Sequence, residues 1–331
     1  MHRLTLLFED GRSVRIEARP AETVYAAALR QKVRLESDCL EGACATCKGL
    51  CTDGSFELGD YVEEALSEEE RAVGFTLACQ MRATSDCVLE FPYPSTQALT
   101  KIAPVEELGR VALSEAVAAD VVRLVIDLPR SMVYLPGQYV KLRVPGRGEW
   151  RSYSMANAHD ASGRLTFYVK VLSDGAMSEY VTARVRVGDE IVVQGPFGHF
   201  YLRPPTRPIV MIAGGTGLAP MLAMLERLVA SPSFREPIYL LYGANQAAEF
   251  FATDQLVAFG AIDLHVERIA VSGDGWAGAT GHVTTLLRDA LLHGGNVDCY
   301  LCGPPPMVEA AQRWLAARSI KRIFAEKFLP S

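Results

Sequence analysis

The sequence predicts three successive folded segments: an α+β segment over residues 1–97, a small antiparallel β-barrel over 98–205 and a parallel α/β segment over 206–331. Three observations predict this multidomain arrangement. Six of the eight cysteines fall within residues 39–87, short strands separated by turns fill the middle, and apolar strands alternate with helices after Ile209. A chain of 331 residues suits two or three domains of about 100–200 residues each. With 49% hydrophobic residues, these domains can bury cores without disulfide staples.

The first segment begins with a β-hairpin. Asp10-Gly11 lies between alternating apolar residues and joins two predicted strands, Leu4–Glu9 and Ser13–Ala18. Thr23 is predicted to cap a helix over Val24–Gln31. The cysteine-rich loop follows, and after it come an acidic stretch at Tyr61–Arg71, a strand at Cys87–Phe91 and a linker at Pro92–Thr96.

The other two segments differ in how their strands are connected. Turns separate the middle strands, which predicts an antiparallel barrel; these strands are Val121–Leu128, Tyr139–Val144, Arg164–Val171 and Glu190–Gln194. Strand–helix alternation in the third segment predicts a parallel sheet covered on both faces. Its strands are Ile209–Ala213, Ile238–Tyr242, Leu264–Ala270 and Val297–Leu301, and its helices are Ala219–Ala230, Thr284–Leu292 and Pro306–Arg318.

Charge and hydropathy exclude two broad classes of function. The net charge of −6 argues against a nucleic-acid-binding protein, which is normally basic. The apolar run Pro208–Leu225 contains Gly214 and Pro220, so it predicts a strand, a turn and a helix and not a membrane span. Without a visible signal peptide, we expect a cytoplasmic protein whose cysteines are ligands or free thiols.

The cysteine spacing is the most specific motif. Cys39-x4-Cys44-x2-Cys47, followed by Cys79 after 31 residues, matches the plant-type [2Fe–2S] pattern. Small residues at 42, 43, 45 and 46 allow backbone N–H groups to approach the sulfurs. A structural zinc site usually shows two C-x2-C pairs and is disfavoured, as is a set of inert buried thiols. Cys51 and Cys87 are interpreted as core residues, with the alternative that Cys51 replaces one of the four ligands.

Two motifs in the middle segment suggest a flavin nucleotide. In Arg151-Ser-Tyr153-Ser154, an arginine can pair with phosphate, a tyrosine can pack on an isoalloxazine ring and a serine can bond a ring nitrogen. Gly175-Ala-Met-Ser178 opens a predicted helix whose free N–H groups suit a pyrophosphate. Taken singly, each motif also occurs by chance, as a surface strand or an ordinary capped helix.

Two motifs in the third segment suggest a second nucleotide. The predicted strand Ile209–Ala213 runs into Gly214-Gly-Thr-Gly-Leu-Ala-Pro220, whose glycines permit a tight turn and close approach of a phosphate. Cys302-Gly-Pro-Pro-Pro-Met307 places Cys302 at the carboxyl end of a strand, where open α/β sheets bind ligands. The alternative for Cys302 is a buried packing thiol.

In this order, the motifs resemble the ferredoxin–NADP reductase superfamily with a plant-type ferredoxin at the N-terminus. The whole chain resembles the NADH-dependent reductase component of aromatic-ring-hydroxylating dioxygenases of the benzoate and anthranilate type. Asp38–Cys47 and the closing Glu326-Lys-Phe328 carry much of this likeness. The resemblance implies a β-grasp ferredoxin, a six-stranded FAD-binding barrel and an NAD-binding α/β domain.

The resemblance also implies a role for each motif residue. Ser154, Cys302 and Glu326 would border the reacting rings. The implied FAD contacts are Arg151, Tyr153, Ser154, the backbone of Phe167, Tyr168, Val169 and Lys170, then Gly175, Met177, Ser178 and Phe328. The implied NADH contacts are Gly214, Gly215, Thr216, Gly217, Pro220, Cys302, Gly303 and Pro304, and the cluster ligands are Cys39, Cys44, Cys47 and Cys79.

The implied activity is electron transfer from NADH through FAD and a [2Fe–2S] cluster to a terminal oxygenase, with a Rieske non-haem iron type favoured. NADH is expected over NADPH because Gly243–Glu249, after a predicted strand, contains no basic residue. The acidic residues Glu63, Glu64, Glu68, Glu69 and Glu70 either help dock the oxygenase or form a solvated helix face. The alternatives are the reductase of a soluble diiron monooxygenase and a non-catalytic NADH redox sensor; a free-standing flavin reductase would not need the cluster.

Overall fold

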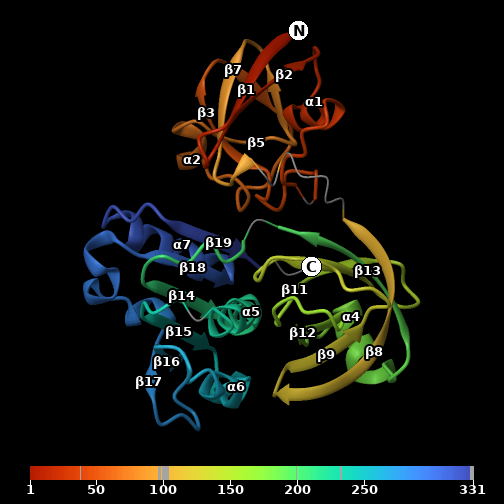
Figure 1. Cartoon of the computed structure of the whole chain (residues 1–331), viewed down its shortest axis with the longest axis vertical. Coiled ribbons are helices and arrows are strands. Elements are labelled where there is room, and N and C mark those ends of the chain that lie inside the picture. Colours follow the sequence, from red (N-terminus) through yellow and green to blue (C-terminus); the bar gives the residue numbers. More distant parts are fainter. Residues whose placement is uncertain (38, 96–97, 99–103, 199, 232, 329–331) are drawn as a thin grey trace. The chain divides into compact units, whose positions relative to one another are not determined.

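The computed structural model describes residues 1–37, 39–95, 98, 104–198, 200–231 and 233–328. It divides into two compact units, the first made of residues 1–103 with 197–199 and the second of 104–196 with 200–331. Figure 1 shows both units, coloured along the sequence. The predicted boundary at 97/98 and the end of the predicted linker lie beside or within residues that the structure does not describe. The predicted boundary at 205/206 stays a prediction.

The first unit is built on a five-stranded mixed sheet in the order β2-β1-β7-β3-β5. β1 (His2–Phe8) and β2 (Ser13–Ala18) form the antiparallel hairpin predicted around Asp10-Gly11, and β7 (Cys87–Phe91) runs parallel to β1. The helix α1 (Val24–Arg30) begins where predicted, because the Thr23 hydroxyl accepts the Ala26 N–H at 3.2 Å. Its buried face joins the core of this sheet.

The remaining elements of this unit follow the cysteine loop along the chain. They are β3 (Lys48–Asp53), β4 (Phe56–Leu58), α2 (Glu68–Ala72), β5 (Phe75–Leu77) and β6 (Met81–Ala83), with β4 and β6 paired as a separate ribbon. The sequence did not predict β3, β4, β5 or β6. The last three have three residues each, too short to show a period of two, and the register of β3 is irregular between Cys51 and Asp53.

The second unit begins with a six-stranded antiparallel sheet in the order β11-β10-β13-β8-β9-β12. The Ala156 N–H, just after β11, donates to the Thr166 carbonyl of β12 at 2.8 Å, so the two edges of the sheet meet. The sequence did not predict β8 and β11. Two bulges interrupt the alternation of apolar residues along β8, and β11 contains the Arg-Ser-Tyr-Ser motif. The strands are β8 (Val105–Ala118), β9 (Val121–Asp127), β10 (Tyr139–Arg143), β11 (Trp150–Ser154), β12 (Arg164–Lys170) and β13 (Glu190–Phe197).

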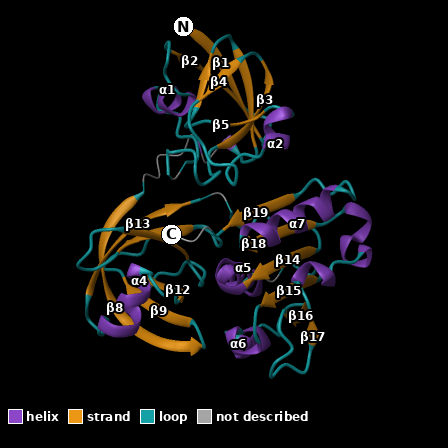
Figure 2. Cartoon of the chain, turned by 180° about the vertical axis from the view of Figure 1, so that it is seen from behind, coloured by secondary structure: helices purple, strands orange, loops and turns teal. Residues whose placement is uncertain are grey.

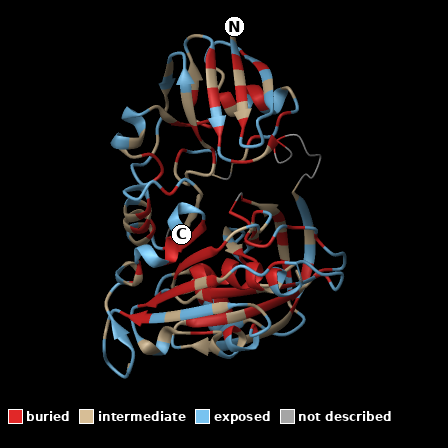
Figure 3. Cartoon of the chain, turned by 60° about the vertical axis from the view of Figure 1, so that its left-hand side comes forward, coloured by how far each residue is buried: buried red, intermediate tan, exposed pale blue. Residues whose placement is uncertain are grey.

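A parallel six-stranded sheet follows in the order β17-β16-β15-β14-β18-β19. Its central strands are buried except at Gly214 and Tyr239, and they appear mostly red in Figure 3. They are β14 (Ile209–Gly214), β15 (Ile238–Ala244) and β18 (Asp298–Gly303), flanked by β16 (Leu264–Ala270), β17 (Ala279–Thr280) and β19 (Ile323–Lys327). The sequence missed β17, which has two residues, and β19, none of whose residues is fully buried.

Helices cover both faces of this sheet, as Figure 2 shows. The helices α5 (Leu218–Val229) and α6 (Thr253–Ala258) pack on the face that Ile209 and Met211 present. The helix α7 (Pro305–Ala316) packs on the opposite face, with Val210 and Ile212. Alternate residues of β14 therefore enter two different cores, which explains why the strand is apolar without alternation.

The helix predicted at Thr284–Leu292 is wrong. Two short 3-10 helices, η4 (Val283–Leu286) and η5 (Asp289–Gly295), replace it, with Leu287 and Arg288 extended between them. β-branched residues at 283–285 weaken helix propensity. Burial of Leu287 and the ion pair between Arg288 and Glu267 (3.1 Å) favour the break.

Four other short helical elements bear on function. α4 (Ala176–Glu179) starts at Gly175, as predicted, and continues into a π-helical turn, η1 (Tyr180–Arg184). Two 3-10 turns follow strands, η2 (Gly215–Gly217) after β14 and η3 (Ala247–Glu249) after β15. Within the described ranges, no helix combines the length and the apolar character needed to cross a membrane.

Candidate functional site

The cysteine loop curls so that amide groups meet sulfur. The Glu41 and Ala43 N–H groups donate to Cys39 Sγ at 3.4 and 3.3 Å, and the Cys39 N–H donates to Cys44 Sγ at 3.4 Å. The curl needs a glycine at position 42, where φ is +77° and a Cβ would lie 2.5 Å from the Asp60 carbonyl oxygen. Such N–H···S bonds stabilise thiolates, so this loop fits a thiolate-bound cluster.

The four predicted ligands lie together as two thiol pairs. The side chains of Cys39 and Cys44 share a hydrogen bond, which lowers the pKa of Cys39 to about 5 and raises that of Cys44. The side chains of Cys79 and Cys47 share a second hydrogen bond, which lowers the pKa of Cys79 to about 7 and raises that of Cys47. All four thiols are free of disulfides. Over the described residues, no group of three or more His, Cys, Asp or Glu side chains is arranged to hold a single metal ion.

The two cysteines outside the motif also meet. Cys51 on β3 and Cys87 on β7 interact through their side chains, and burial raises the pKa of Cys51 to about 11. Cys87 is 2% exposed and belongs to the core of the first unit, and Cys51 packs against that core. Both positions agree with their interpretation as packing residues.

The Arg-Ser-Tyr-Ser motif lies on β11 at the edge of the barrel sheet. Arg151 and Tyr153 alternate with Ser154, so the arginine and tyrosine lie on the opposite face from Ser154. The Arg151 guanidinium is paired with Glu149 at 2.7 Å. Tyr153 meets the edge of Phe167 at 6.4 Å between ring centroids, and burial raises its pKa. The arginine is half-buried and offers the positive charge that a nucleotide phosphate requires.

The second flavin motif is tied to β12 by Ser178. The Ser178 hydroxyl accepts the Leu172 N–H at 2.9 Å and lies 3.4 Å from the Lys170 carbonyl oxygen, so this serine shapes the loop after β12. The Lys170 side chain is paired with Asp120 and, at 3.3 Å, with Glu249. The Lys170 ammonium group is therefore paired within the protein. The FAD contact expected at this position would come from the backbone of β12.

The glycine turn after β14 fits closely against β18. A Cβ on Gly217 would lie 2.1 Å from the Cys302 carbonyl oxygen, and one on Gly214 would lie 2.6 Å from Met307 Sδ. At Gly215, where φ is +52°, a Cβ would meet nothing within 4 Å. Gly214 and Gly217 thus pack against the protein, whereas the backbone at Gly215 is open. An open glycine backbone allows a nucleotide phosphate to approach closely. Thr216 lies within the turn, and Pro220 in the first turn of α5.

Residues from both sheets of the second unit converge at the end of β18. Cys302 pairs in register with Glu326 of β19, and the Ser154 hydroxyl donates to Glu326 Oε2 at 3.2 Å. The Phe328 N–H donates to the Gly303 carbonyl at 2.9 Å. Cys302 is fully buried, which raises the pKa of its thiol, and Glu326 raises it further. Glu326 therefore contacts both Cys302, its partner in the strand register, and Ser154, which lies 172 residues away in the sequence.

Three side chains of the second unit that make contacts between its elements were not singled out from the sequence. Glu226 on α5 and Gln255 on α6 bridge the barrel to the parallel sheet, and neither belongs to a motif. Arg268 on β16 is opposite Tyr242 in the strand register, and its guanidinium lies over the rings of Phe250 and Trp276 at 5.6 and 5.5 Å. Sequence spacing could not place a β16 residue beside the loop after β15.

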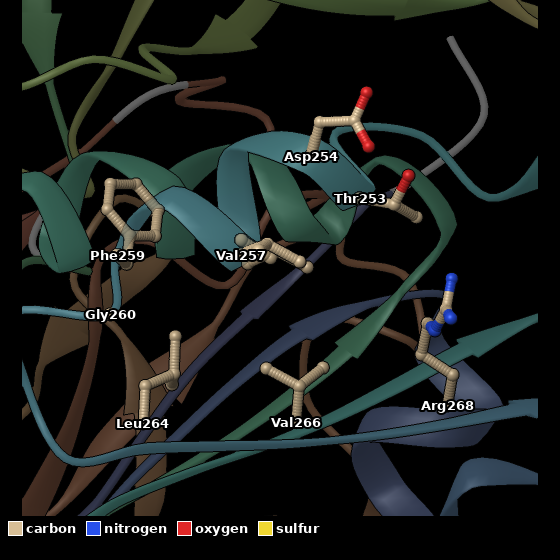
Figure 4. Close-up of a pocket in the computed structure, with 9 residues that line it drawn as sticks. Thr253, Asp254, Val257, Phe259, Gly260, Leu264, Val266 and Arg268 are labelled. Atoms are coloured by element: carbon tan, nitrogen blue, oxygen red, sulfur yellow. The ribbon is translucent and has the colours of Figure 1, made fainter.

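A cavity of about 530 Å³ lies between α6 and β16. Figure 4 shows Arg268 and Thr253 at one end and Phe259 and Leu264 at the other. None of the predicted site residues lines it.

Comparison with known proteins places the three segments in three domain families. Residues 7–84 match the 2Fe-2S iron-sulfur cluster binding domain, residues 109–201 the oxidoreductase FAD-binding domain and residues 211–313 the oxidoreductase NAD-binding domain. The toluate 1,2-dioxygenase electron transfer component of Pseudomonas putida is 38% identical over 100% of this chain and 99% of that protein. The anthranilate 1,2-dioxygenase counterpart of Acinetobacter baylyi is 36% identical, over 100% of this chain and 98% of that protein.

The chain belongs to the family of dioxygenase electron transfer components. Solved structures agree: a cytochrome P450 reductase of Amycolatopsis is 29% identical with a TM-score of 0.69, covering 100% of this chain and 99% of that chain. The ferredoxin reductase of carbazole 1,9a-dioxygenase is 25% identical with a TM-score of 0.71, covering 99% of each. This family member is an oxidoreductase with [2Fe–2S], FAD and NAD domains, which confirms the predicted fold class and cofactors.

Proposed function

We propose that this dioxygenase electron transfer component takes electrons from NADH and delivers them singly to a terminal oxygenase of the Rieske non-haem iron type that acts on an aromatic acid. The observation that carries the proposal is the meeting of Ser154, Cys302 and Glu326 beside the glycine turn, in a chain that also carries the four-cysteine loop. The toluate, 2-halobenzoate and anthranilate relatives, 36–38% identical, support an aromatic carboxylate as the oxygenase substrate.

The residues divide the work between nucleotide and cluster. Bound FAD converts a hydride donor into a source of single electrons, and the [2Fe–2S] cluster supplies a one-electron carrier. Cys39, Cys44, Cys47 and Cys79 would hold the cluster, and the N–H groups of Glu41 and Ala43 would stabilise its thiolates.

At the flavin, the chain's residues bind and orient. Arg151 would pair with a phosphate in place of Glu149, and Tyr153 would cover one face of the ring. The Ser154 hydroxyl, oriented by its hydrogen bond to Glu326, would contact the bound flavin. The open backbone at Gly215 and the buried end of β18 at Cys302 would seat the nicotinamide and exclude water.

One alternative is supported by relatives. Propane 2-monooxygenase reductase components from Mycolicibacterium goodii and Gordonia are 32% identical over 95% of this chain. Their lower identity favours the dioxygenase partner.

Reconstitution with purified oxygenases tests the proposal. The protein should support NADH-dependent turnover of an aromatic-acid dioxygenase, and turnover should be at least about tenfold slower with a propane-type monooxygenase. Faster turnover with the monooxygenase would reverse the assignment. Failure to reduce ferricyanide with NADH would instead favour a redox sensor.

A further inference from the structure

One carboxylate joins the barrel to the parallel sheet from within α5. The Ala158 N–H donates to Glu226 Oε2 at 2.7 Å, and the Gln255 amide donates to Glu226 Oε1 at 3.4 Å. Ala158 lies four residues after Ser154, and Gln255 lies on α6. Both oxygens of Glu226 are therefore engaged, one with the barrel and one with the neighbouring helix.

The connection continues to the strand predicted to line the flavin. The Tyr168 hydroxyl on β12 donates to Gln255 Oε1 at 3.3 Å, and its ring packs on Phe251 with centroids 4.4 Å apart. Hydrogen bonds thus run from β12 through Gln255 and Glu226 to the segment after β11. Tyr168 is 6% exposed, so this network borders the shared core of the two sheets.

The other hydrogen bonds that hold this segment go to the barrel, and Ala156 packs in the core that the barrel shares with α5. Ala156 N–H donates to the Thr166 carbonyl at 2.8 Å, and Asn157 Oδ1 accepts the Thr166 N–H at 2.8 Å. Met155 and Ala156 are buried. The bond from Ala158 to Glu226 adds a directional hydrogen bond between this segment and α5, four residues after Ser154.

The position of α5 matters because its first residue follows the glycine turn directly. Leu218 opens the helix after Gly215–Gly217, and Glu226 lies about two turns further on. A helix of this length is stiff, so an anchor at Glu226 also fixes the turn. An ionised carboxylate makes stronger hydrogen bonds than a neutral acceptor and suits such an anchor.

We propose that Glu226 is a positioning residue for hydride transfer, which sets the distance between the nicotinamide-binding turn of α5 and the flavin-facing Ser154 and Tyr168. The inference rests on the proposed function, since it assigns no new reaction. Glu226 would touch neither ring. It would act through the Ala158 N–H and through Gln255.

The test compares Glu226→Ala, Glu226→Gln and the control Glu236→Ala in the FAD-loaded full chain. Glu236 is exposed and lies before β15, away from the network. Glu226→Ala should lower the rate of flavin reduction at saturating NADH by about tenfold or more, while KM for NADH changes less than about threefold. Glu226→Gln keeps an oxygen for the Ala158 N–H and should restore the rate to within about threefold of the parent. Glu236→Ala should match the parent.

A second readout does not depend on turnover. Hydrogen–deuterium exchange of the peptide over residues 155–158 should be faster in Glu226→Ala and near the parent rate in Glu226→Gln. A Glu226→Ala enzyme with the parent rate would overturn the proposal, as would a Gln variant no better than Ala or unchanged exchange at 155–158. If the parent itself fails to oxidise NADH, the proposed function fails, while the exchange measurement still tests the anchor.

Discussion

At the scale of residues, the site depends on close packing more than on unusual charge. Gly217 sits against the Cys302 carbonyl, and Ser154 reaches Glu326 across 3.2 Å. In the other unit, N–H groups converge on Cys39. Each contact fixes a position where a bound group would react, so single substitutions should separate binding from electron transfer.

Cys44→Ala should abolish electron delivery and spare hydride transfer. Removal of one of four thiolates should leave a cluster that is lost or unstable. The variant should keep its flavin absorbance and reduce ferricyanide with NADH, but lose the broad cluster absorbance and nearly all transfer to the oxygenase.

Cys51→Ala is the matched control for Cys44→Ala. It should keep the cluster and both activities, with a modest packing loss of about 1 kcal/mol. Cluster loss in this control would show that the ligand assignment is wrong, whereas oxygenase turnover by Cys44→Ala would refute the order of electron carriers.

Gly217→Ala should disturb the nucleotide turn. Its Cβ would lie 2.1 Å from a backbone oxygen, so the turn must shift, at a cost of about 1–3 kcal/mol. We expect a lower thermal midpoint and a sharply raised KM for NADH. Gly260→Ala, where the nearest atom is 3.5 Å away, is the control and should change neither. An unaltered KM in Gly217→Ala would contradict the placement of NADH at this turn.

Among the elements, α2 and the loop after β15 are the subjects of two predictions that rest on charge: docking of the oxygenase and preference for NADH. α2 buries none of its residues and is closed at Ser67 by a capping box with Glu70. Glu70 also pairs with Lys48 at 2.6 Å, and Glu68 pairs with Arg71 at 3.3 Å. Part of the acidic stretch is therefore engaged within the unit, and its role in docking stays a prediction.

Electron delivery to the oxygenase should slow as salt rises. Residues 1–97 carry a net charge of −7, and attraction to a basic surface on the partner would be screened over about 10 Å at 0.1 M salt. Second-order rates of electron delivery, measured between about 20 and about 500 mM salt, test this prediction. A rate independent of salt would leave α2 as an ordinary solvated helix.

NADH should be preferred over NADPH by at least about tenfold in kcat/KM. The 2′-phosphate of NADPH requires a nearby cation, and Gly243–Glu249, which spans the end of β15 and the turn after it, contains none. The structure adds Arg268, whose guanidinium covers Phe250 and Trp276 beside this loop. Equal kcat/KM values would contradict the preference, and Arg268→Ala would then show whether this guanidinium is the cation responsible.

At the scale of the whole molecule, the two compact units separate the two kinds of chemistry. The four cysteines lie in the first unit, and the FAD and NAD motifs lie in the second. The second unit has three hydrophobic cores of its own, one of which joins the barrel to the parallel sheet. Hydride transfer should therefore be a property of the second unit alone.

A chain of residues 98–331 should fold, bind FAD and reduce ferricyanide with NADH at a rate within about threefold of the full chain. It should fail to support the oxygenase, because it has no cluster ligands. Circular dichroism and flavin content confirm folding before the assay. A folded, FAD-loaded fragment that cannot oxidise NADH would show that the first unit takes part in hydride transfer.

Features that depend on local spacing could be predicted from the sequence alone. The Asp10-Gly11 hairpin, the Thr23 cap, the cysteine loop and the turn after β14 are specified by residues within about ten positions of one another, and the resemblance carried by the motifs gave the family. The tertiary structure decided what local spacing does not encode. It broke the helix expected at Thr284–Leu292 because burial of Leu287 outweighs helical continuity, and it formed β19 by pairing with β18. It also joined Ser154 to Glu326, and Glu226 to Ala158, because two sheets pack against each other, a result of side-chain shape across the whole second unit.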